Sequence, residues 1–155
     1  MRIIGIDPGT ATTGFGVIES SRGRLVFVDA GVITTPAGQP MPERLVTLHT
    51  ELAQVLADAR PDQSAVEQLF FATNVTTAIS VGQARGVILL ALAEAGLIPA
   101  EYTPMQIKQA VTGYGGAKKP QMQAMVQTLL ALPQIPRPDD AADALGIAIT
   151  HAHSS

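Results

Sequence analysis

Residues 1–10 read MRIIGIDPGT, a short apolar run that is broken abruptly by an aspartate, a proline and a glycine. The run from Met1 to Ile6 is typical of a buried strand, and the Asp-Pro-Gly-Thr sequence after it is typical of a turn. Asp7 is therefore predicted to lie at the end of a strand, facing the turn. Ser-Ala-Val at 64–66 leads into Glu67 in the same way, which predicts a second carboxylate at a strand end.

The rest of the chain alternates between strand and helix patterns. β-branched and aromatic residues at 15–19 and 25–33 flank a Ser-Ser-Arg-Gly turn, which with the first run predicts an antiparallel meander. Two further strands are predicted, around Val66 and over 97–102. The predicted helices cover 42–60, 75–95, 104–111, 120–132 and 139–153. This order predicts an α/β layer fold, with a mixed five-stranded sheet flanked by helices, in one domain over residues 1–155.

Two more carboxylates lie in the last predicted helix, where residues 138–153 read PDDAADALGIAITHAH. Pro138 suits the first turn of a helix, and three-residue spacing puts Asp140 and Asp143 on one face. Asp139 is one residue out of phase and is predicted to point elsewhere. Acidic residues in a first turn also stabilise a helix through its dipole, so for this pair alone that interpretation stays open.

Four carboxylates are thus predicted to converge: Asp7, Glu67, Asp140 and Asp143. Carboxylates repel one another when gathered out of water, so such a group is expected to bind hard cations such as Mg²⁺. Two divalent ions about 3.5–4 Å apart can activate a water and stabilise the leaving oxygen in phosphodiester cleavage. Asp7 is the expected bridging ligand. Glu67 and Asp143 would hold one ion each, and Asp140 would complete a shell or orient the water.

A basic, glycine-rich segment is the expected contact to nucleic acid. Residues 108–121, KQAVTGYGGAKKPQ, hold three lysines, three glycines and no acid, and a helix is predicted to start within them. Backbone amides at that start, flanked by Lys118 and Lys119, are suited to bind phosphate, and the alternative is a solvated loop. Arg85 is a weaker candidate for the same patch, because an arginine on a long helix is more often a surface or ion-pair residue.

Two adjacent phenylalanines follow the strand that carries Glu67. One of Phe70 and Phe71 is expected in the core. The other is expected beside the cleavage site, where an aromatic ring can stack on a base or wedge against it. Spacing alone does not choose between the two.

The long predicted helix carries Ala78, Gly82 and Gly86 at four-residue intervals. A line of small residues lets another backbone approach closely. That backbone is either the domain's own sheet or a second copy related by a two-fold axis, and both interpretations stay open.

The histidines are expected to be surface or packing residues. His151 lies eight residues beyond Asp143, which is about 12 Å along a helix and too far to share a metal ion. His49 and His153 are interpreted in the same way.

Composition excludes several classes of protein. With 155 residues, 46% of them hydrophobic, the chain can bury one well-packed core. The absence of cysteine excludes disulfides and thiolate zinc sites. No stretch is expected to span a membrane, and the strand directly after Met1 and Arg2 differs from a signal peptide, so we expect a cytoplasmic protein. The net charge of −3 does not exclude a nucleic-acid partner, because much of the negative charge belongs to the predicted metal site.

Four segments in this order and spacing resemble the RuvC family of bacterial Holliday-junction resolvases: GIDPGTATTGFGVI, AVEQLFFATN, GQARGVILLALA and DDAADALGIAITHAH. The resemblance runs from Arg2 to His153 and implies a ribonuclease-H-like fold. It implies a dimeric endonuclease that cuts two opposed strands of four-way junction DNA with Mg²⁺ or Mn²⁺, and partnership with the RuvA and RuvB branch-migration proteins. A dimer is implied because two symmetric incisions require two active sites.

The same resemblance implies roles for particular residues. The family's four carboxylate positions fall on the acidic group already described. Its base-contacting aromatic falls on Phe70, and its DNA-binding lysines fall on Lys108 and Lys119.

Other functions are weighed against this one. GIDPGT also resembles the phosphate-binding turn of actin-like ATPases and sugar kinases, but the chain lacks a second glycine-rich turn of that kind. A junction-binding module without catalysis is disfavoured because all four acidic positions are filled. A ribonuclease-H-type hybrid nuclease is weakly disfavoured by the basic loop and by the aromatic after Glu67.

Overall fold

The computed structural model describes residues 1–9, 11–68 and 75–154. In these residues five strands form one mixed sheet in the order β3-β2-β1-β4-β5. Their bounds are β1 Arg2–Asp7, β2 Thr12–Ser21, β3 Arg24–Thr34, β4 Gln63–Glu67 and β5 Ala100–Tyr102. The first three strands run antiparallel, and β4 and β5 join β1 in parallel. The predicted meander and the mixed five-stranded sheet are confirmed.

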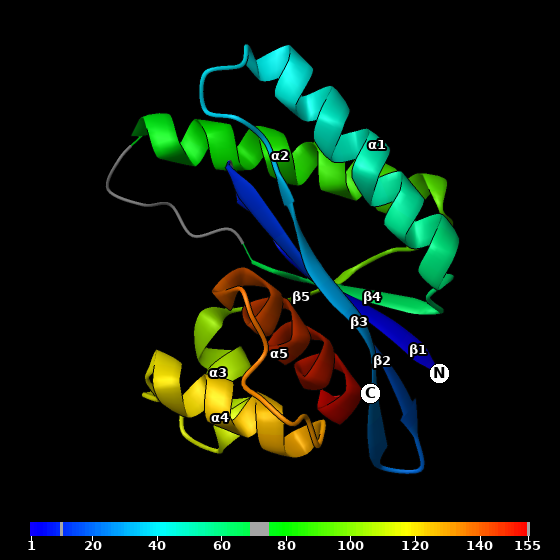
Figure 1. Cartoon of the computed structure of the whole chain (residues 1–155), viewed down its shortest axis with the longest axis vertical. Helices are drawn as coiled ribbons and strands as arrows, with labels where there is room; N and C mark the ends of the chain where they lie inside the picture. Colours follow the sequence, from blue (N-terminus) through cyan, green and yellow to red (C-terminus); the bar gives the residue numbers. More distant parts are fainter. Residues whose placement is uncertain (10, 69–74, 155) are drawn as a thin grey trace.

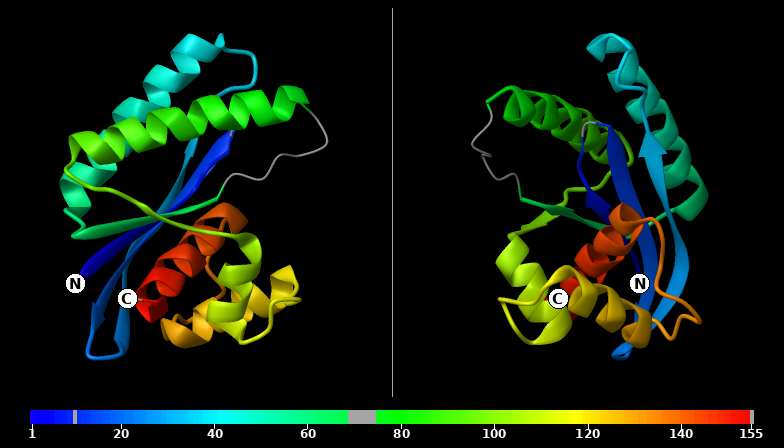
Figure 2. Two further views of the ribbon diagram at one scale, coloured as in Figure 1. Left: turned by 180° about the vertical axis from the view of Figure 1, so that it is seen from behind. Right: turned by 60° about the vertical axis from the view of Figure 1, so that its left-hand side comes forward.

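Five helices cover the two faces of this sheet (Figure 1). Their bounds are α1 Met41–Ala59, α2 Val75–Glu94, α3 Pro104–Thr112, α4 Lys119–Leu129 and α5 Asp139–Ser154. Helices α1 and α2 lie on one face, and α5 lies on the other with α3 and α4 beside it (Figure 2). Each predicted helix is present, although α4 ends three residues earlier than predicted and β5 is shorter than its predicted strand.

Residues 3–6 of the central strand β1 are apolar and buried, because helices cover both faces of the strand. Ile4 and Ile6 point into the core shared with α1 and α2, whereas Ile3 points into the core shared with α3, α4 and α5. This follows from the two-residue period of a strand, in which successive side chains point to opposite faces. Two separate hydrophobic cores therefore hold β1 in place, and its carboxyl end at Asp7 is fixed from both sides.

Helix α5 lies unusually close to the sheet because glycines stand beneath it. A Cβ atom at Gly5 would lie 2.2 Å from the carbonyl oxygen of Ala144, and one at Gly14 would lie 2.0 Å from that of Asp140. At Gly16 a Cβ would lie 2.7 Å from the nitrogen of Leu145. No side chain fits at these distances, so the backbone of α5 rests directly on the backbones of β1 and β2.

Helix α2 differs from what the sequence predicted. It is 20 residues long with a mean hydropathy of 1.5, so by length and composition it is apolar enough to cross a membrane, and the expectation that no stretch qualifies was wrong. Only 28% of the 18-residue stretch of α2 to which this hydropathy refers is buried. Cβ atoms at Gly82 and Gly86 would meet nothing within 4 Å, so these glycines do not pack on the domain's own sheet.

The exposed face of α2 carries further apolar residues. Val75, Ile79 and Leu90 are exposed, and their spacing places them on the same face as Gly82 and Gly86. This stripe, which we call the α2 stripe, consists of Val75, Ile79, Gly82, Gly86 and Leu90.

Candidate metal site and nucleic-acid interface

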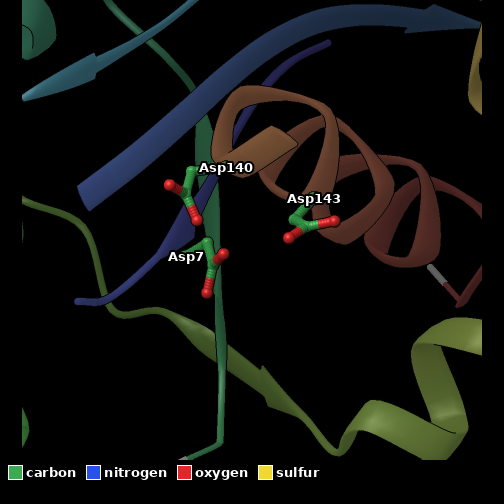
Figure 3. A group of neighbouring side chains, drawn as sticks. All are labelled: Asp7, Asp140 and Asp143. Atoms are coloured by element: carbon green, nitrogen blue, oxygen red, sulfur yellow. The ribbon is translucent and has the colours of Figure 1, made fainter. Parts of the chain in front are cut away.

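Three of the four predicted carboxylates form a compact group. Asp7, Asp140 and Asp143 each offer an oxygen, and these oxygens lie within 4.8 Å of one another. Figure 3 shows Asp7 at the end of β1 and the other two on the first turns of α5. The three-residue spacing brings both α5 carboxylates to one side of the helix, as predicted. The close contact between Gly14 and the backbone of Asp140 sets how near this side comes to β1.

Glu67 is the last residue of β4 and lies beside Asp7. The parallel pairing of β1 with β4 ends at Ile6 and Val66, which puts the two following carboxylates next to each other. They share a hydrogen bond, which raises the pKa of Asp7 and lowers that of Glu67. The closeness of the two carboxyl groups is thus one of the causes that raise the pKa of Asp7.

Burial and mutual repulsion raise the pKa of most of the group. Burial, followed by the charges of Glu67 and Asp143, raises the pKa of Asp7 to about 8. Burial also raises the pKa of Glu67 and that of Asp143, in the latter case against the opposing effect of Lys119. The raised pKa values mean that the ionised forms of these carboxyl groups are disfavoured in the folded protein. A bound cation would stabilise the ionised forms.

The ligand atoms of this group suit a hard divalent cation. Every one is a carboxylate oxygen, the donor type that Mg²⁺, Mn²⁺ and Ca²⁺ prefer over nitrogen or sulfur. His151 lies elsewhere: its Nδ1 is 2.7 Å from the hydroxyl of Tyr102 and its Nε2 is 2.7 Å from Oε1 of Gln63. The prediction that His151 is a packing residue is confirmed.

A cavity of about 460 Å³ opens beside Glu67 and Asp143. The predicted lysines Lys108, Lys118 and Lys119 line it together with the glycine-rich segment before α4. The cavity is therefore lined by both carboxylates and ammonium groups. Its three lysines suit an anionic polymer that approaches the carboxylates, such as a nucleic-acid strand.

Lys119 is ion-paired with two acidic residues at the start of α5. Its Nζ lies 3.7 Å from Oδ2 of Asp143 and 3.5 Å from Oδ2 of Asp139. Asp139 also accepts a hydrogen bond of 3.0 Å from Nε2 of Gln123 on α4. Asp139 thus points toward α4 and away from the carboxylate group, as its phase on the helix predicted.

Among the described residues, Arg85 is not one of those that line this cavity, so its contact to DNA stays a prediction. Its side chain is only 11% exposed and is ion-paired with Glu101 on β5. One guanidinium nitrogen, Nη1, donates a 2.7 Å hydrogen bond to the carbonyl oxygen of Glu67.

Two features of the site were not predicted from the sequence. These are the glycines under α5 and the partner of Arg85, Glu101, which in the sequence is one polar residue inside a short strand. The predicted stacking residue Phe70 and its neighbour Phe71 lie outside the described residues.

Comparison with known proteins agrees with this geometry. A family model described as "Crossover junction endodeoxyribonuclease RuvC" matches residues 3–151. A protein of that name from Chloroflexus aurantiacus is 59% identical over 155 residues, covering 100% of this chain and 94% of the relative. Another, from Desulfitobacterium hafniense, is 59% identical over 154 residues, covering 99% and 93%.

Solved structures give the same result. The structure of "T. thermophilus RuvC in complex with Holliday junction substrate" matches with a TM-score of 0.94 and 39% identity, covering 99% of this chain and 94% of that one. The yeast mitochondrial Holliday junction resolvase Ydc2 matches with a TM-score of 0.70 at 13% identity, covering 97% and 77%, which supports the fold alone.

Proposed function

Because this chain belongs to the RuvC family of crossover junction endodeoxyribonucleases and is a Holliday-junction resolvase, we propose that its carboxylate group cuts the junction with divalent metal ions. The observation that carries this proposal is the convergence of Asp7, Asp140 and Asp143 beside a cavity lined by lysines. The carboxylates fit Mg²⁺, with Mn²⁺ as a substitute, and the lysines fit the phosphates of the strand to be cut.

The four carboxylates would divide the binding of two ions between them. Asp7 is affected by the charges of Glu67, Asp140 and Asp143, so it is the member best placed to be shared by both ions. Bound divalent ions supply an activated water and stabilise the charge that develops on the leaving oxygen. Glu67 and Asp143 would each hold one ion, and Asp140 would complete a shell or orient the water.

The lysines would hold the DNA backbone against this site. Burial raises the pKa of Glu67 and that of Asp143, and Lys108 and Lys119 lie near enough to these two carboxyl groups to oppose that rise. Ammonium groups at these positions would neutralise the phosphates on either side of the scissile bond. Phe70, three residues after Glu67 in the sequence, stays a prediction for the aromatic that stacks on a base near the crossover.

A second copy of the chain is the proposed partner of the α2 stripe. Two symmetric incisions need two carboxylate groups, and the exposed apolar stripe with glycines at its centre would allow two α2 helices to approach closely. The same pairing would remove from water the apolar surface that makes α2 resemble a membrane span. Family membership also leads us to propose a cytoplasmic location, no membrane contact and partnership with RuvA and RuvB.

Cleavage of labelled four-way, linear and RNA/DNA hybrid substrates tests the proposal. With Mg²⁺ the protein should cut the four-way junction in two opposed strands and leave the others largely intact. Asp7→Asn, Glu67→Gln, Asp140→Asn and Asp143→Asn should each abolish cutting but keep junction affinity, because only metal ligands are lost. Asp139→Asn is the matched control on the same helix and should retain cutting. Near-wild-type cleavage by Asp7→Asn or Glu67→Gln would exclude the metal mechanism.

A further inference from the structure

The guanidinium of Arg85 joins three elements at the edge of the carboxylate group. Arg85 belongs to α2, donates from Nη1 to the carbonyl oxygen of Glu67 at the end of β4, and pairs with Glu101 of β5. None of these contacts is needed to bury apolar surface. Arg85 as a whole residue is only 9% exposed, so its guanidinium has these two bonds in place of most of its contacts with water.

The backbone at Glu67 needs such a support because the sheet ends there. The pairing of β1 with β4 stops at Ile6 and Val66, one residue before the carboxylate. On the other side β5 still holds the chain, through the pairing of Glu67 with Tyr102 and the 2.8 Å bond from the amide of Gln68 to the carbonyl of Tyr102. The sheet therefore fixes the Glu67 peptide from one side only.

We propose that Arg85, anchored by Glu101, is a positioning residue that holds the Glu67 backbone so that its carboxylate faces Asp7 and the metal site. The proposal rests on the proposed metal-dependent function. A planar guanidinium with two bonded nitrogens fixes direction as well as distance, which a lysine ammonium cannot do. Arg85 never touches the metal or the DNA in this role; it acts through the peptide group of Glu67.

The chain contains a matched control for this arrangement. At the opposite end of β1, Arg2 donates from Nη1 to the carbonyl oxygen of Ala59 at 2.9 Å and from Nε to Glu19 at 2.9 Å. It is thus also an arginine bound to one carbonyl and one glutamate, but it lies at the far end of the strand from Asp7. Arg2→Lys and Arg85→Lys remove the same chemistry from two places.

The test compares three measurements on the full-length protein: thermal melting without metal, Mn²⁺ binding to the protein alone by calorimetry, and junction affinity in EDTA. Support groups behind metal ligands are typically worth 10- to 100-fold in metal affinity. Arg85→Lys should weaken Mn²⁺ binding by about that factor while junction affinity stays unchanged. A higher Mg²⁺ concentration should restore part of the junction cleavage that Arg85→Lys loses. Arg2→Lys should change melting only.

Two results would overturn the inference. Equal loss of melting temperature in both variants, with wild-type Mn²⁺ affinity in Arg85→Lys, would make Arg85 a stabilising residue and nothing more. If Arg85→Lys does not fold, Glu101→Gln loosens the anchor at a half-exposed position, and unchanged Mn²⁺ affinity there would equally refute the proposal. Failure of the proposed function itself looks different, because the wild type would then bind no Mn²⁺ and cut no junction.

Discussion

The two faces of the sheet hold their helices in opposite ways. Under α5 the strands present Gly5, Gly14 and Gly16, and backbone rests on backbone. Toward α1 and α2 they present large side chains such as Ile4 and Val17, which fill a core of aliphatic volume. The face with the carboxylates thus combines a core of its own, which includes Ile3 and Ile18, with direct contact of main chains, whereas the other face is held by side-chain packing.

This difference indicates which face tolerates change. Side-chain packing can adjust to a lost methyl group by rotamer changes, at a cost in stability but without moving distant atoms far. A backbone contact has no such freedom, because an added Cβ must displace the helix itself. The geometry of the carboxylate group therefore depends on the absence of side chains at these glycines.

The largest predicted effect on the carboxylate face of the sheet is a change of stability with pH. Burial and neighbouring carboxylates raise the pKa of Asp7 from 3.8 to about 8. Between these values the folded protein keeps a proton that the unfolded chain releases, so the free energy of unfolding should fall as the pH rises from about 4 to about 8. Each pKa unit corresponds to on the order of 1 kcal/mol, so we expect a loss of several kcal/mol in the metal-free protein.

Thermal melting in EDTA across this pH range measures the effect. Asp7→Asn cannot ionise at this position and should melt higher than the wild type at pH values near 8, with a flatter dependence on pH. A wild-type melting temperature that increases steadily from pH 5 to pH 8 would contradict the sign of this prediction.

Gly14→Ala should break the carboxylate face at a moderate cost in stability. The new Cβ would lie 2.0 Å from the carbonyl oxygen of Asp140, so α5 must move outward. Overpacking of this kind typically costs about 1–3 kcal/mol, but the displaced Asp140 and Asp143 should lose the metal and with it junction cleavage. Chemical denaturation and Mn²⁺ calorimetry on the same sample measure both effects.

Leu52→Ala is the counterpart on the opposite face. Leu52 is fully buried in the core under α1, and its truncation should cost about 2–5 kcal/mol of stability. Cleavage well below the melting temperature should nevertheless remain near wild type. If Leu52→Ala lost cleavage while Gly14→Ala kept it, the distinction between the two faces would be wrong.

Gly86→Ala should have the smallest effect, and it should be stabilising in the monomer. A Cβ there meets nothing within 4 Å, and alanine favours a helix over glycine by about 0.5–1 kcal/mol. If the α2 stripe contacts a second copy, the same methyl group should weaken dimerisation. Denaturation at low concentration combined with sedimentation analysis measures both, and an unchanged dimer constant would remove Gly86 from the interface.

Much of the carboxylate group could be predicted from local patterns. Strand ends at Asp7 and Glu67 and three-residue spacing in α5 are properties of short segments, and the structure reproduces them. The glycines beneath α5 are different in kind, because Gly14 and Asp140 are 126 positions apart in the sequence. Their contact depends on how α5 lies across the sheet, which no local periodicity encodes.

The surroundings of Arg85 and of the α2 stripe could not be predicted from the sequence for a related reason. A charged residue in an apolar helix looks the same in sequence whether it faces solvent or a buried partner, and Glu101 lies in another element. Likewise, hydropathy measures how apolar α2 is but not whether its own core, a second chain or a lipid covers it.

The contact between α5 and the first two strands also determines when the protein can become active during its synthesis. Chains emerge from the ribosome N-terminus first, at about 5–20 residues per second, so β1 and β2 wait for many seconds before α5 appears. Until then Asp7 has neither Asp140 nor Asp143 beside it. Nascent chains that end before α5 therefore carry no assembled carboxylate group and cannot cut DNA near the ribosome.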